Sequence, residues 1–472
     1  MMDTMLAARA YEGETRFRVE EIPVPRIGGE DVLVAVDATG ITRGLLSLWQ
    51  RTDRIKLLPA VLGHEIAGTV AAVGRDVHGV AEGDRVRVHS PLIRPNDLYA
   101  LTDDEAASPD VCVIGHAIYG DGAMPLYERY HNGGLAEYVK VPHWSLDPLP
   151  PNIGFDVASR VHSLGIAWRA LRKADPRQGY HGATLVVTGA SGAAGGAVVL
   201  CAPLWGFSRI IAVARTRAAL ERTAALAPGL VEVLPIEELD AGWEQADGLS
   251  ARIREMTGGR GADCVIDYLP ANPAMTQQAI FAMANGGTAV LGGGNWSSLT
   301  FQYGRLMATN YQIKGCNGLS RRDAAQILSL MEAGRLDPSP LLTHRMPLER
   351  VNDAVELIET RAGMPLFITI DPPTSTDPDF RTKVVTADAE HRAAAAPAEL
   401  EVGGLYDLVI DEEFENQWTG PLGIGHIQGR HVQIPRAKVG DRFRVRIVSL
   451  GVHRWTGQPD VQVEIESPAQ EG

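Results

Sequence analysis

The chain has 472 residues, of which 45% are hydrophobic and 22% charged, and its formal net charge is −14. This length exceeds what one hydrophobic core organises, so two or three domains are expected, and the acidic balance argues against a surface that coats nucleic acid. No stretch has the length and apolar character of a membrane span or a signal peptide, so we expect a cytoplasmic protein without membrane attachment. The four cysteines lie far apart, which excludes a disulfide framework and a cysteine-rich zinc site.

Residues 1 to about 151 have the pattern of short β-strands. Asp31–Asp37 alternates with valine on one side, and Ala67–Val73 and Arg85–His89 are further strands bounded by turn residues. After Asp156 the pattern changes to alternating helices and strands, which predicts an α/β domain with a parallel sheet. The predicted helices are Val157–Arg172, Arg217–Ala225, Leu249–Met256 and Met275–Ala284, and the predicted buried strands include Cys264–Asp267 and Thr288–Leu291.

A glycine-rich turn lies at the centre of this second region. The apolar strand Leu185–Val187 precedes it, a small-residue helix from Gly196 to about Trp205 follows, and a second strand, Ile210–Val213, completes a βαβ unit. The spacing G-x-x-G-x-x-G allows a tight turn, close approach to a pyrophosphate and close helix packing, although a plain turn is the alternative. The predicted cofactor contacts in the turn are Gly189, Ser191, Gly192, Ala193, Ala194 and Gly195.

The end of the second strand bears on the choice of nicotinamide cofactor. NAD sites usually carry Asp or Glu at this position, to accept hydrogen bonds from the ribose hydroxyls. This chain has Ala214 there, followed by Arg215 and Arg217 with no carboxylate nearby in the sequence. Guanidiniums suit a 2′-phosphate, so we predict NADP(H), and the alternative is that both arginines belong to a solvated helix start.

The C-terminal part has a different composition. Residues 372–399 are rich in Pro, Thr, Asp and Ala and are interpreted as a linker, and residues 400–472 alternate like a small five-stranded barrel. The stretch Ile434–Ile447 resembles a TRAM domain, an OB-like module of tRNA-modifying enzymes. Seven basic residues against one acid between Arg430 and Arg454 fit RNA binding, whereas a solvated edge or a protein-docking module remains the alternative.

Several ordered motifs resemble the medium-chain dehydrogenase/reductase superfamily, the zinc alcohol dehydrogenase and quinone reductase group. They are Gly63–Val70, Gly83–Val86 and Asn132–Val139, followed by the glycine turn, Thr257–Asp267 and Gly286–Thr288. The resemblance covers residues 5 to 371. It implies a GroES-like catalytic domain (residues 1–155 and 305–371), a Rossmann domain (residues 156–304), an active site in the cleft between them, and a homodimer or homotetramer.

The residue-by-residue match puts catalytic zinc in doubt. Thr42 and Ser163 stand where zinc-dependent relatives have cysteines, and His64 and Glu65 are kept. Hydroxyls are poor zinc ligands, and His162 is offset by one position and is expected to point away from the matched direction. A separate site at Cys112 and His116 is weighed against ordinary loop residues. We therefore predict no zinc, with a rearranged site of His64, Glu65 or His162 as the alternative.

The resemblance then implies an NADP(H)-dependent oxidoreductase acting on a small carbonyl, a quinone or a carbonyl-conjugated alkene. Its candidate catalytic residues are Thr42, His64, Glu65 and Ser163. Further cofactor contacts implied by family position are Arg43, Leu269, Gly293 and Asn317. The alternatives are a zinc-dependent alcohol dehydrogenase, or an NADPH-binding protein whose C-terminal module binds RNA or a protein partner.

Overall fold

The structure is a computed structural model of the chain. It describes residues 4–52, 54–174, 182–295 and 297–376, and in the C-terminal part residues 404–416, 420–427, 430–435, 437–438, 440–452 and 459–468. The chain forms two compact units, one of Met1–Ala354 with Met364–Arg381 and one of Val355–Gly363 with Thr382–Gly472. Among the described residues, none of the helices is both long enough and apolar enough to span a bilayer.

One half of the first unit is built mainly on antiparallel strands, and its last two strands along the chain pair in parallel. A seven-stranded sheet has the order β10-β6-β5-β3-β18-β17, with β9 paired to β3, and a three-stranded sheet has the order β2-β1-β4. The strands are β1 (Thr4–Ala10), β2 (Arg18–Pro23), β3 (Asp31–Ile41), β4 (Ala60–Val61), β5 (Glu65–Val73), β6 (Arg85–Val88), β7 (Pro91–Leu92), β8 (Cys112–Val113), β9 (Tyr138–Pro142), β10 (Leu146–Pro148), β17 (Leu342–Pro347) and β18 (Phe367–Asp371). The helices are α1 (Arg43–Arg51), α2 (Leu98–Leu101) and α3 (Met124–Tyr130). Helix α12 (Val351–Thr360) begins in the first unit, and its residues from Val355 on belong to the second.

The second half of the first unit is a six-stranded parallel sheet in the order β13-β12-β11-β14-β15-β16. This is the doubly wound order of a dinucleotide-binding fold. Its strands are β11 (Ala183–Thr188), β12 (Phe207–Ala214), β13 (Val231–Pro235), β14 (Ala262–Asp267), β15 (Met283–Leu291) and β16 (Gln312–Gly315). Its helices are α4 (Phe155–Ser159), α5 (Val161–Ala174), α6 (Ala193–Cys201), α7 (Arg217–Ala224), α8 (Gly248–Met256), α9 (Pro273–Phe281), α10 (Tyr303–Thr309) and α11 (Arg321–Glu332).

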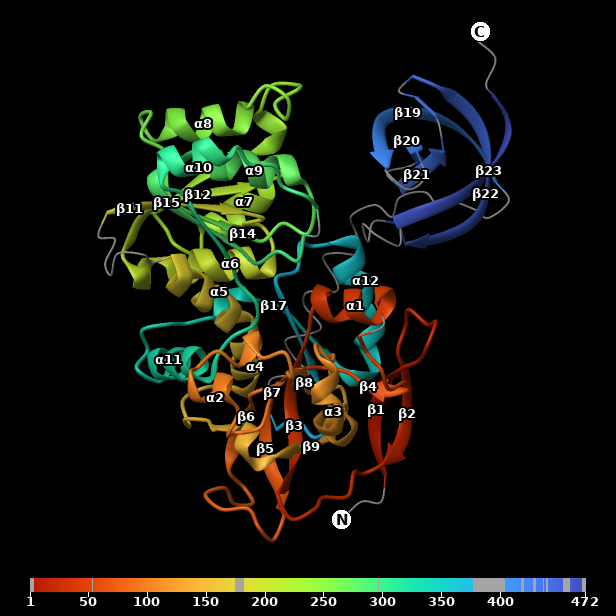
Figure 1. Ribbon diagram of the computed structural model, residues 1–472. Coiled ribbons are helices and arrows are strands. Elements are labelled where there is room, and N and C mark those ends of the chain that lie inside the picture. Colours follow the sequence, from red (N-terminus) through yellow and green to blue (C-terminus); the bar gives the residue numbers. More distant parts are fainter. Residues whose placement is uncertain are drawn as a thin grey trace. The chain divides into compact units, whose positions relative to one another are not determined.

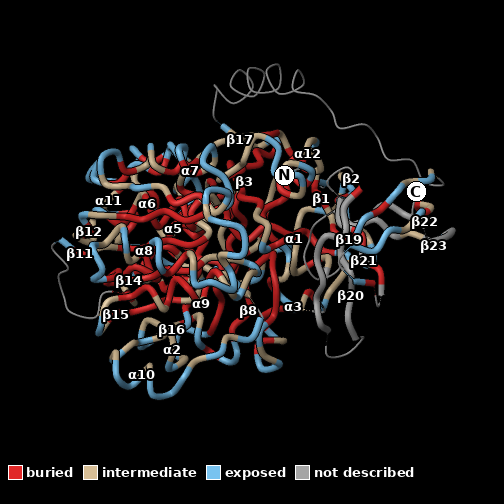
Figure 2. Tube along the Cα trace, turned by 90° about the horizontal axis from the view of Figure 1, so that it is seen from above, coloured by how far each residue is buried: buried red, intermediate tan, exposed pale blue. Residues whose placement is uncertain are grey.

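The central strand β11 is buried on both faces, as its unbroken apolar sequence predicts. Leu185 and Val187 join the core that includes residues of α5, α6 and α11, and Val186 joins the core that includes residues of α8 and α9. Figure 1 shows these helices on the two faces of the sheet, and Figure 2 shows the strands between them as buried. The carboxyl ends of the strands are therefore the part of this sheet that is free to meet a ligand.

Two predicted boundaries need correction. Strand β16 pairs with β15, so the parallel sheet continues beyond residue 304, where the sequence placed the end of the Rossmann domain. The predicted linker begins later than residue 372, because the Thr374 hydroxyl donates to the Val36 carbonyl at 2.6 Å and the Thr376 amide donates to Asp37 at 2.7 Å. Residues 377–399 of that linker lie outside the described residues.

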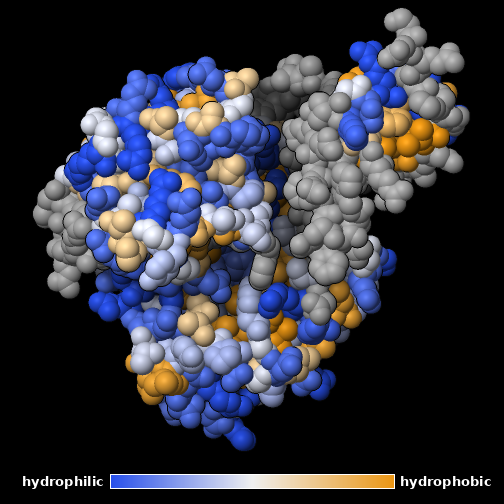
Figure 3. Space-filling model, turned by 45° about the horizontal axis from the view of Figure 1, so that its top comes forward, coloured by the Kyte–Doolittle hydropathy of each residue, from blue (hydrophilic) through white to orange (hydrophobic). Residues whose placement is uncertain are grey.

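The described strands of the second unit form a closed five-stranded barrel in the order β19-β20-β21-β23-β22, as the alternation predicted. They are β19 (Leu405–Asn416), β20 (Gly420–Ile427), β21 (Arg430–Pro435), β22 (Arg442–Val452) and β23 (Pro459–Pro468). Leu408, Val432 and Val445 fill its core. Leu405, Val409 and Ile465 of the module are 44%, 45% and 45% exposed. Apolar surface is also visible on the module in Figure 3. Its likeness to a TRAM domain stays a prediction.

Candidate active site

The glycine turn has the geometry that close approach to a dinucleotide requires. Gly189 has φ +69°, and a Cβ on Gly195 would collide with the carbonyl oxygen of Gly189 and come within 2.7 Å of the Ala190 Cα. Helix α6 therefore packs directly onto the end of β11. Gly192 is the N-cap residue, and the first amides of α6 belong to Ala193, Ala194 and Gly195. Helix N-terminal amides without intrahelical partners bind phosphate groups, so these residues fit the pyrophosphate of a nicotinamide cofactor.

Loops from neighbouring strands meet this turn. A Cβ on Gly189 would lie 3.0 Å from the backbone of Tyr268, and a Cβ on Gly293 would lie 2.7 Å from the Leu269 amide nitrogen. Leu269 and Gly293 therefore lie at the carboxyl ends of β14 and β15, next to the glycine turn. Asn317 is exposed just after β16, and Arg43 is the first residue of α1. The contacts of these four residues with a cofactor stay predictions.

The end of β12 differs from the sequence prediction in one respect. Arg217 donates two hydrogen bonds to Glu238, at 2.5 and 2.7 Å, and its backbone amide donates to Glu237 at 2.7 Å. The expectation that no carboxylate lies near the two arginines is therefore wrong, because Glu237 and Glu238 approach from a turn that is distant in sequence. Arg215 is exposed, and no ion pair within the described residues engages its guanidinium.

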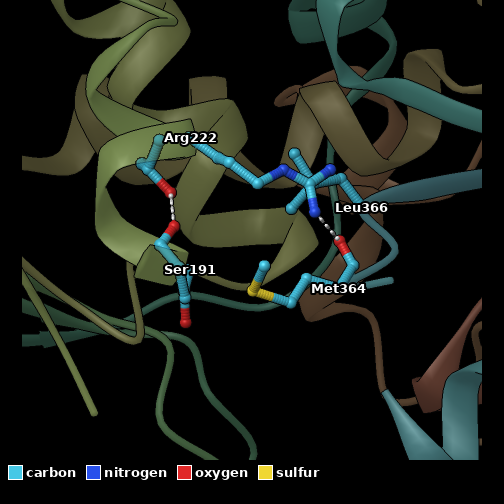
Figure 4. A pocket seen from close by; sticks show the side chains of 6 residues that line it. Ser191, Arg222, Met364 and Leu366 are labelled. Carbon is cyan, nitrogen blue, oxygen red and sulfur yellow. Dashed lines mark hydrogen bonds between the residues drawn. The ribbon is translucent and has the colours of Figure 1, made fainter. Parts of the chain in front are cut away.

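A small hollow lies beside the glycine turn. Ser191, Ala219, Arg222, Thr223, Met364 and Leu366 line it. Figure 4 shows the Arg222 side chain crossing the hollow to the Met364 carbonyl, which accepts its hydrogen bond at 3.2 Å. This contact ties α7 to the segment before β18, and Ser191 stands at the opposite edge.

A buried ion pair lies where the β-rich half meets α5. The Arg160 guanidinium donates to the Glu65 carboxylate, and the Ser163 hydroxyl donates to the other Glu65 oxygen at 2.7 Å. The side chains of Arg160 and Glu65 are 1% and 0% exposed. The Arg160 guanidinium also stacks over the Phe367 ring at 4.5 Å. Glu65 and Ser163 are thus committed to Arg160, a residue that the sequence analysis did not single out.

The Thr42 side chain caps a helix in this structure. Thr42 is the N-cap residue of α1, where its hydroxyl oxygen accepts from the Leu45 amide at 3.1 Å. Capping uses a lone pair of the hydroxyl and leaves its proton available to donate.

Three histidines from separate segments form a cluster. The ring centroid of His64 lies 4.4 Å from that of His116 and 4.7 Å from that of His162. The expectation that His162 points away from the matched direction is wrong, because it is Ser163 that turns to Glu65 while His162 faces His64. The three residues are 5%, 8% and 6% exposed, and within the described part of the chain their Nδ1 atoms have no hydrogen-bond partner.

Burial controls the charge of this cluster. Desolvation, with a smaller contribution from the positive charge of Arg160, lowers the pKa of His64 to about 3. Desolvation also lowers the pKa of His116 and of His162 well below the usual range. The three imidazoles are therefore neutral at physiological pH.

His116 was considered in the sequence only as a partner of Cys112. The buried thiol of Cys112 instead faces the Leu92 carbonyl at 3.7 Å, and burial raises its pKa to about 12. A signal in the sequence could have linked His116 to His64, since both follow a glycine. Gly63 and Gly115 both have positive φ and approach each other so closely that a Cβ on Gly115 would lie 2.5 Å from the Gly63 carbonyl oxygen.

Comparison with known proteins agrees with this architecture. Residues 28–152 match the model of the alcohol dehydrogenase GroES-like domain, and residues 193–333 match that of the zinc-binding dehydrogenase. An NAD-dependent alcohol dehydrogenase of Sulfurisphaera tokodaii is 31% identical over 366 residues, which are 75% of this chain and 96% of the relative. The chain belongs to the medium-chain dehydrogenase/reductase superfamily. As a member, it is an oxidoreductase that uses a nicotinamide cofactor.

More distant relatives of this superfamily member include the sorbitol dehydrogenase of Mus musculus, 24% identical over 76% of this chain and 94% of the relative. The solved structure of the alcohol dehydrogenase TADH from Thermus sp. ATN1 has a TM-score of 0.65 at 26% identity, and the match covers 78% of this chain and 99% of that chain. The names of these relatives include both alcohol and polyol dehydrogenases, so they leave the substrate open.

The donor set does not fit the zinc of the superfamily. Thr42 and Ser163 offer hydroxyls where thiolates are needed, and Glu65 is already paired with Arg160. As they stand, no three His, Cys, Asp or Glu side chains of the described residues are grouped so that they could hold a metal ion. The buried guanidinium next to His64 would also repel a dication.

Proposed function

We propose that the protein is an NADP(H)-dependent oxidoreductase that works without zinc on a small carbonyl compound, a quinone or a carbonyl-conjugated alkene. The observation that carries this proposal is the buried group of Glu65, Arg160 and Ser163. It places a guanidinium, rather than open ligands, beside His64. A second candidate, a zinc alcohol dehydrogenase with a rearranged site, draws support from the contact between His64 and His162.

The chemistry favours a conjugated substrate. The nicotinamide supplies or accepts the hydride, and the protein contributes orientation and stabilises developing charge. Reduction of an isolated ketone builds alkoxide charge, which normally needs a Lewis acid or a strong proton donor. In an enone or a quinone the charge spreads over a conjugated system. Hydrogen bonds from neutral groups such as Thr42 and His64 then suffice, because less charge gathers on one oxygen.

The cofactor preference rests on the end of β12. Ala214 cannot accept hydrogen bonds from ribose hydroxyls through its side chain, and the exposed Arg215 suits a 2′-phosphate. Arg217 contributes only if it leaves Glu238. Both side chains of that pair are nearly half exposed, so the pair is a weak competitor for a phosphate.

The first experiment is a joint measurement of metal content and cofactor binding on the full purified chain. We expect well under one equivalent of transition metal and tighter binding of NADPH than of NADH. Oxidation of NADPH should then follow addition of cyclohex-2-enone or a benzoquinone. One equivalent of zinc, lost on chelation together with alcohol oxidation, would support the second candidate instead. Failure to bind either nucleotide would overturn both.

The proposal also covers the oligomeric state and the role of the C-terminal barrel. We expect a homodimer or homotetramer, which light scattering on the full chain would establish. The barrel is proposed to contact RNA or a protein partner, and a gel shift with single-stranded RNA separates the two. The exposed guanidiniums of Arg442 and Arg444 on β22 support a phosphate-binding face.

A further inference from the structure

We propose that His64, His116 and His162 together form the pocket that holds the reacting oxygen of an uncharged substrate. This inference rests on the proposed function and adds two residues, His116 and His162, to its site. The pocket replaces a metal ion as the group that fixes the oxygen. We call these three residues the histidine pocket.

The histidine pocket is built by three separate segments. His64 precedes β5, His116 lies in the turn after β8, and His162 lies in the first turn of α5. The turn with His116 reaches His64 only because three glycines touch. A Cβ on Gly115 would lie 2.5 Å from the Gly133 Cα, and a Cβ on Gly133 would collide with the Gly63 carbonyl oxygen. The Ser90 hydroxyl donates to the His64 carbonyl and fixes the backbone on the other side.

The pocket has unused hydrogen-bonding capacity. All three Nδ1 atoms are buried, and no partner for them is found among the described residues. A buried polar group without a hydrogen-bond partner destabilises the fold, so three at one place call for a ligand that satisfies them. Each neutral imidazole carries one N–H donor and one acceptor nitrogen. A carbonyl or hydroxyl oxygen, or the water that it displaces, matches this capacity.

The charges around the pocket favour an uncharged ligand. Arg160 is paired with Glu65, and Arg87 is paired with Asp147 at 2.5 Å. His89 also faces the cluster, and burial together with Arg87 lowers its pKa well below the usual range. The guanidiniums of Arg160 and Arg87 are thus engaged by carboxylates of the protein and are not available for a carboxylate or phosphate of a ligand. The positive charge of Arg160 also opposes a dication. An enone, a quinone or a simple ketone is neither an anion nor a dication, so it is compatible with these charges.

The test compares His116→Phe with His116→Asn in the full chain. Phenylalanine keeps the ring volume and removes both nitrogens, whereas asparagine restores a hydrogen-bonding group. With cyclohex-2-enone, we expect His116→Phe to raise KM by about fivefold to a hundredfold, since a buried oxygen left without its hydrogen bond weakens binding by a factor in that range. His116→Asn should recover part of the loss, and NADPH affinity should stay unchanged in both. The exposed His78→Phe is the matched control.

A second readout does not depend on turnover. Imidazole ¹⁵N resonances of the protein with NADP⁺ bound should shift for the histidine pocket, and not for His78, when cyclohex-2-enone is added. Unshifted resonances, or unchanged KM in His116→Phe, would overturn the proposal. One equivalent of transition metal that disappears in His116→Phe would also overturn it, because the cluster would then be a metal site. If the unmodified protein does not bind NADPH, the proposed function itself is refuted.

Discussion

The guanidinium of Arg160 donates to the carboxylate of Glu65 with both side chains almost fully buried. A charge pair removed from water is costly to build, and removal of one partner leaves an uncompensated buried charge. The pair therefore holds α5 against the β-rich half and, at the same time, excludes Glu65 from other roles. Its energetics can be tested directly.

Arg160→Met should lower the free energy of unfolding by about 3–5 kcal/mol, because Glu65 is left buried without its partner. The double variant Arg160→Met, Glu65→Gln should recover much of this loss. Denaturant unfolding gives both values. Arg209→Gln is the control, since the pair of Arg209 with Glu232 is partly exposed and should be worth less than about 1 kcal/mol. Equal effects of Arg160→Met and Arg209→Gln would contradict the buried pair.

Gly40→Ala should disturb the same group without removing a charge. A Cβ at Gly40 would collide with the Arg160 guanidinium and with the Glu65 carboxylate. Overpacking of this kind costs about 1–3 kcal/mol. Gly304→Ala in α10 meets nothing within 4 Å and should be neutral or stabilising. The midpoints of thermal unfolding of the two variants test this prediction. An unchanged midpoint for Gly40→Ala would contradict the close packing of Gly40 against Arg160 and Glu65.

Arg215→Ala should weaken NADPH binding about tenfold or more and leave NADH binding nearly unchanged, because a charged hydrogen bond to the 2′-phosphate is lost. Glu238→Gln should strengthen NADPH binding, since it releases Arg217 from its carboxylate partner. Fluorescence titration with both nucleotides measures these constants. If Arg215→Ala weakens both nucleotides equally, the arginine does not select the 2′-phosphate.

The histidine pocket should make the protein sensitive to acid. The folded-state pKa of His64 is about 3, and that of His116 is also well below 6.5, so the unfolded chain binds more protons. The free energy of unfolding therefore falls as pH drops below about 6.5. At about pH 5 His64 alone lowers the free energy of unfolding by about 2 kcal/mol relative to neutral pH, and His116 lowers it further.

Urea unfolding at neutral pH and near pH 5 measures this loss. His116→Phe should show the smaller decrease, because one buried imidazole no longer has to stay neutral. His78→Phe should behave like the unmodified protein. An identical acid sensitivity of His116→Phe and the unmodified chain would show that His116 is protonated in the folded state or exposed.

The sequence predicted features that depend on local order. The run Leu185–Val187, the glycine spacing after it and the following helix lie within one βαβ unit, so their pattern alone indicates a dinucleotide turn. The five-stranded barrel followed in the same way from alternation and turns. Periodicity could not predict that β16 joins the parallel sheet, because a four-residue strand leaves little pattern.

Contacts between side chains that are distant in the sequence could not be predicted from local patterns. Glu238 reaches Arg217, and Ser163 rather than His162 turns to Glu65, although neighbouring positions gave no hint of either. The sequence by itself determined the change from a strand-rich region to an α/β region and the dinucleotide-binding turn, since these follow from periodicity and glycine placement, and the resemblance to the superfamily implied the dehydrogenase architecture. Only the tertiary structure decided that Arg160 pairs with Glu65 and that His116 joins His64, because burial and contact between remote segments set these partners.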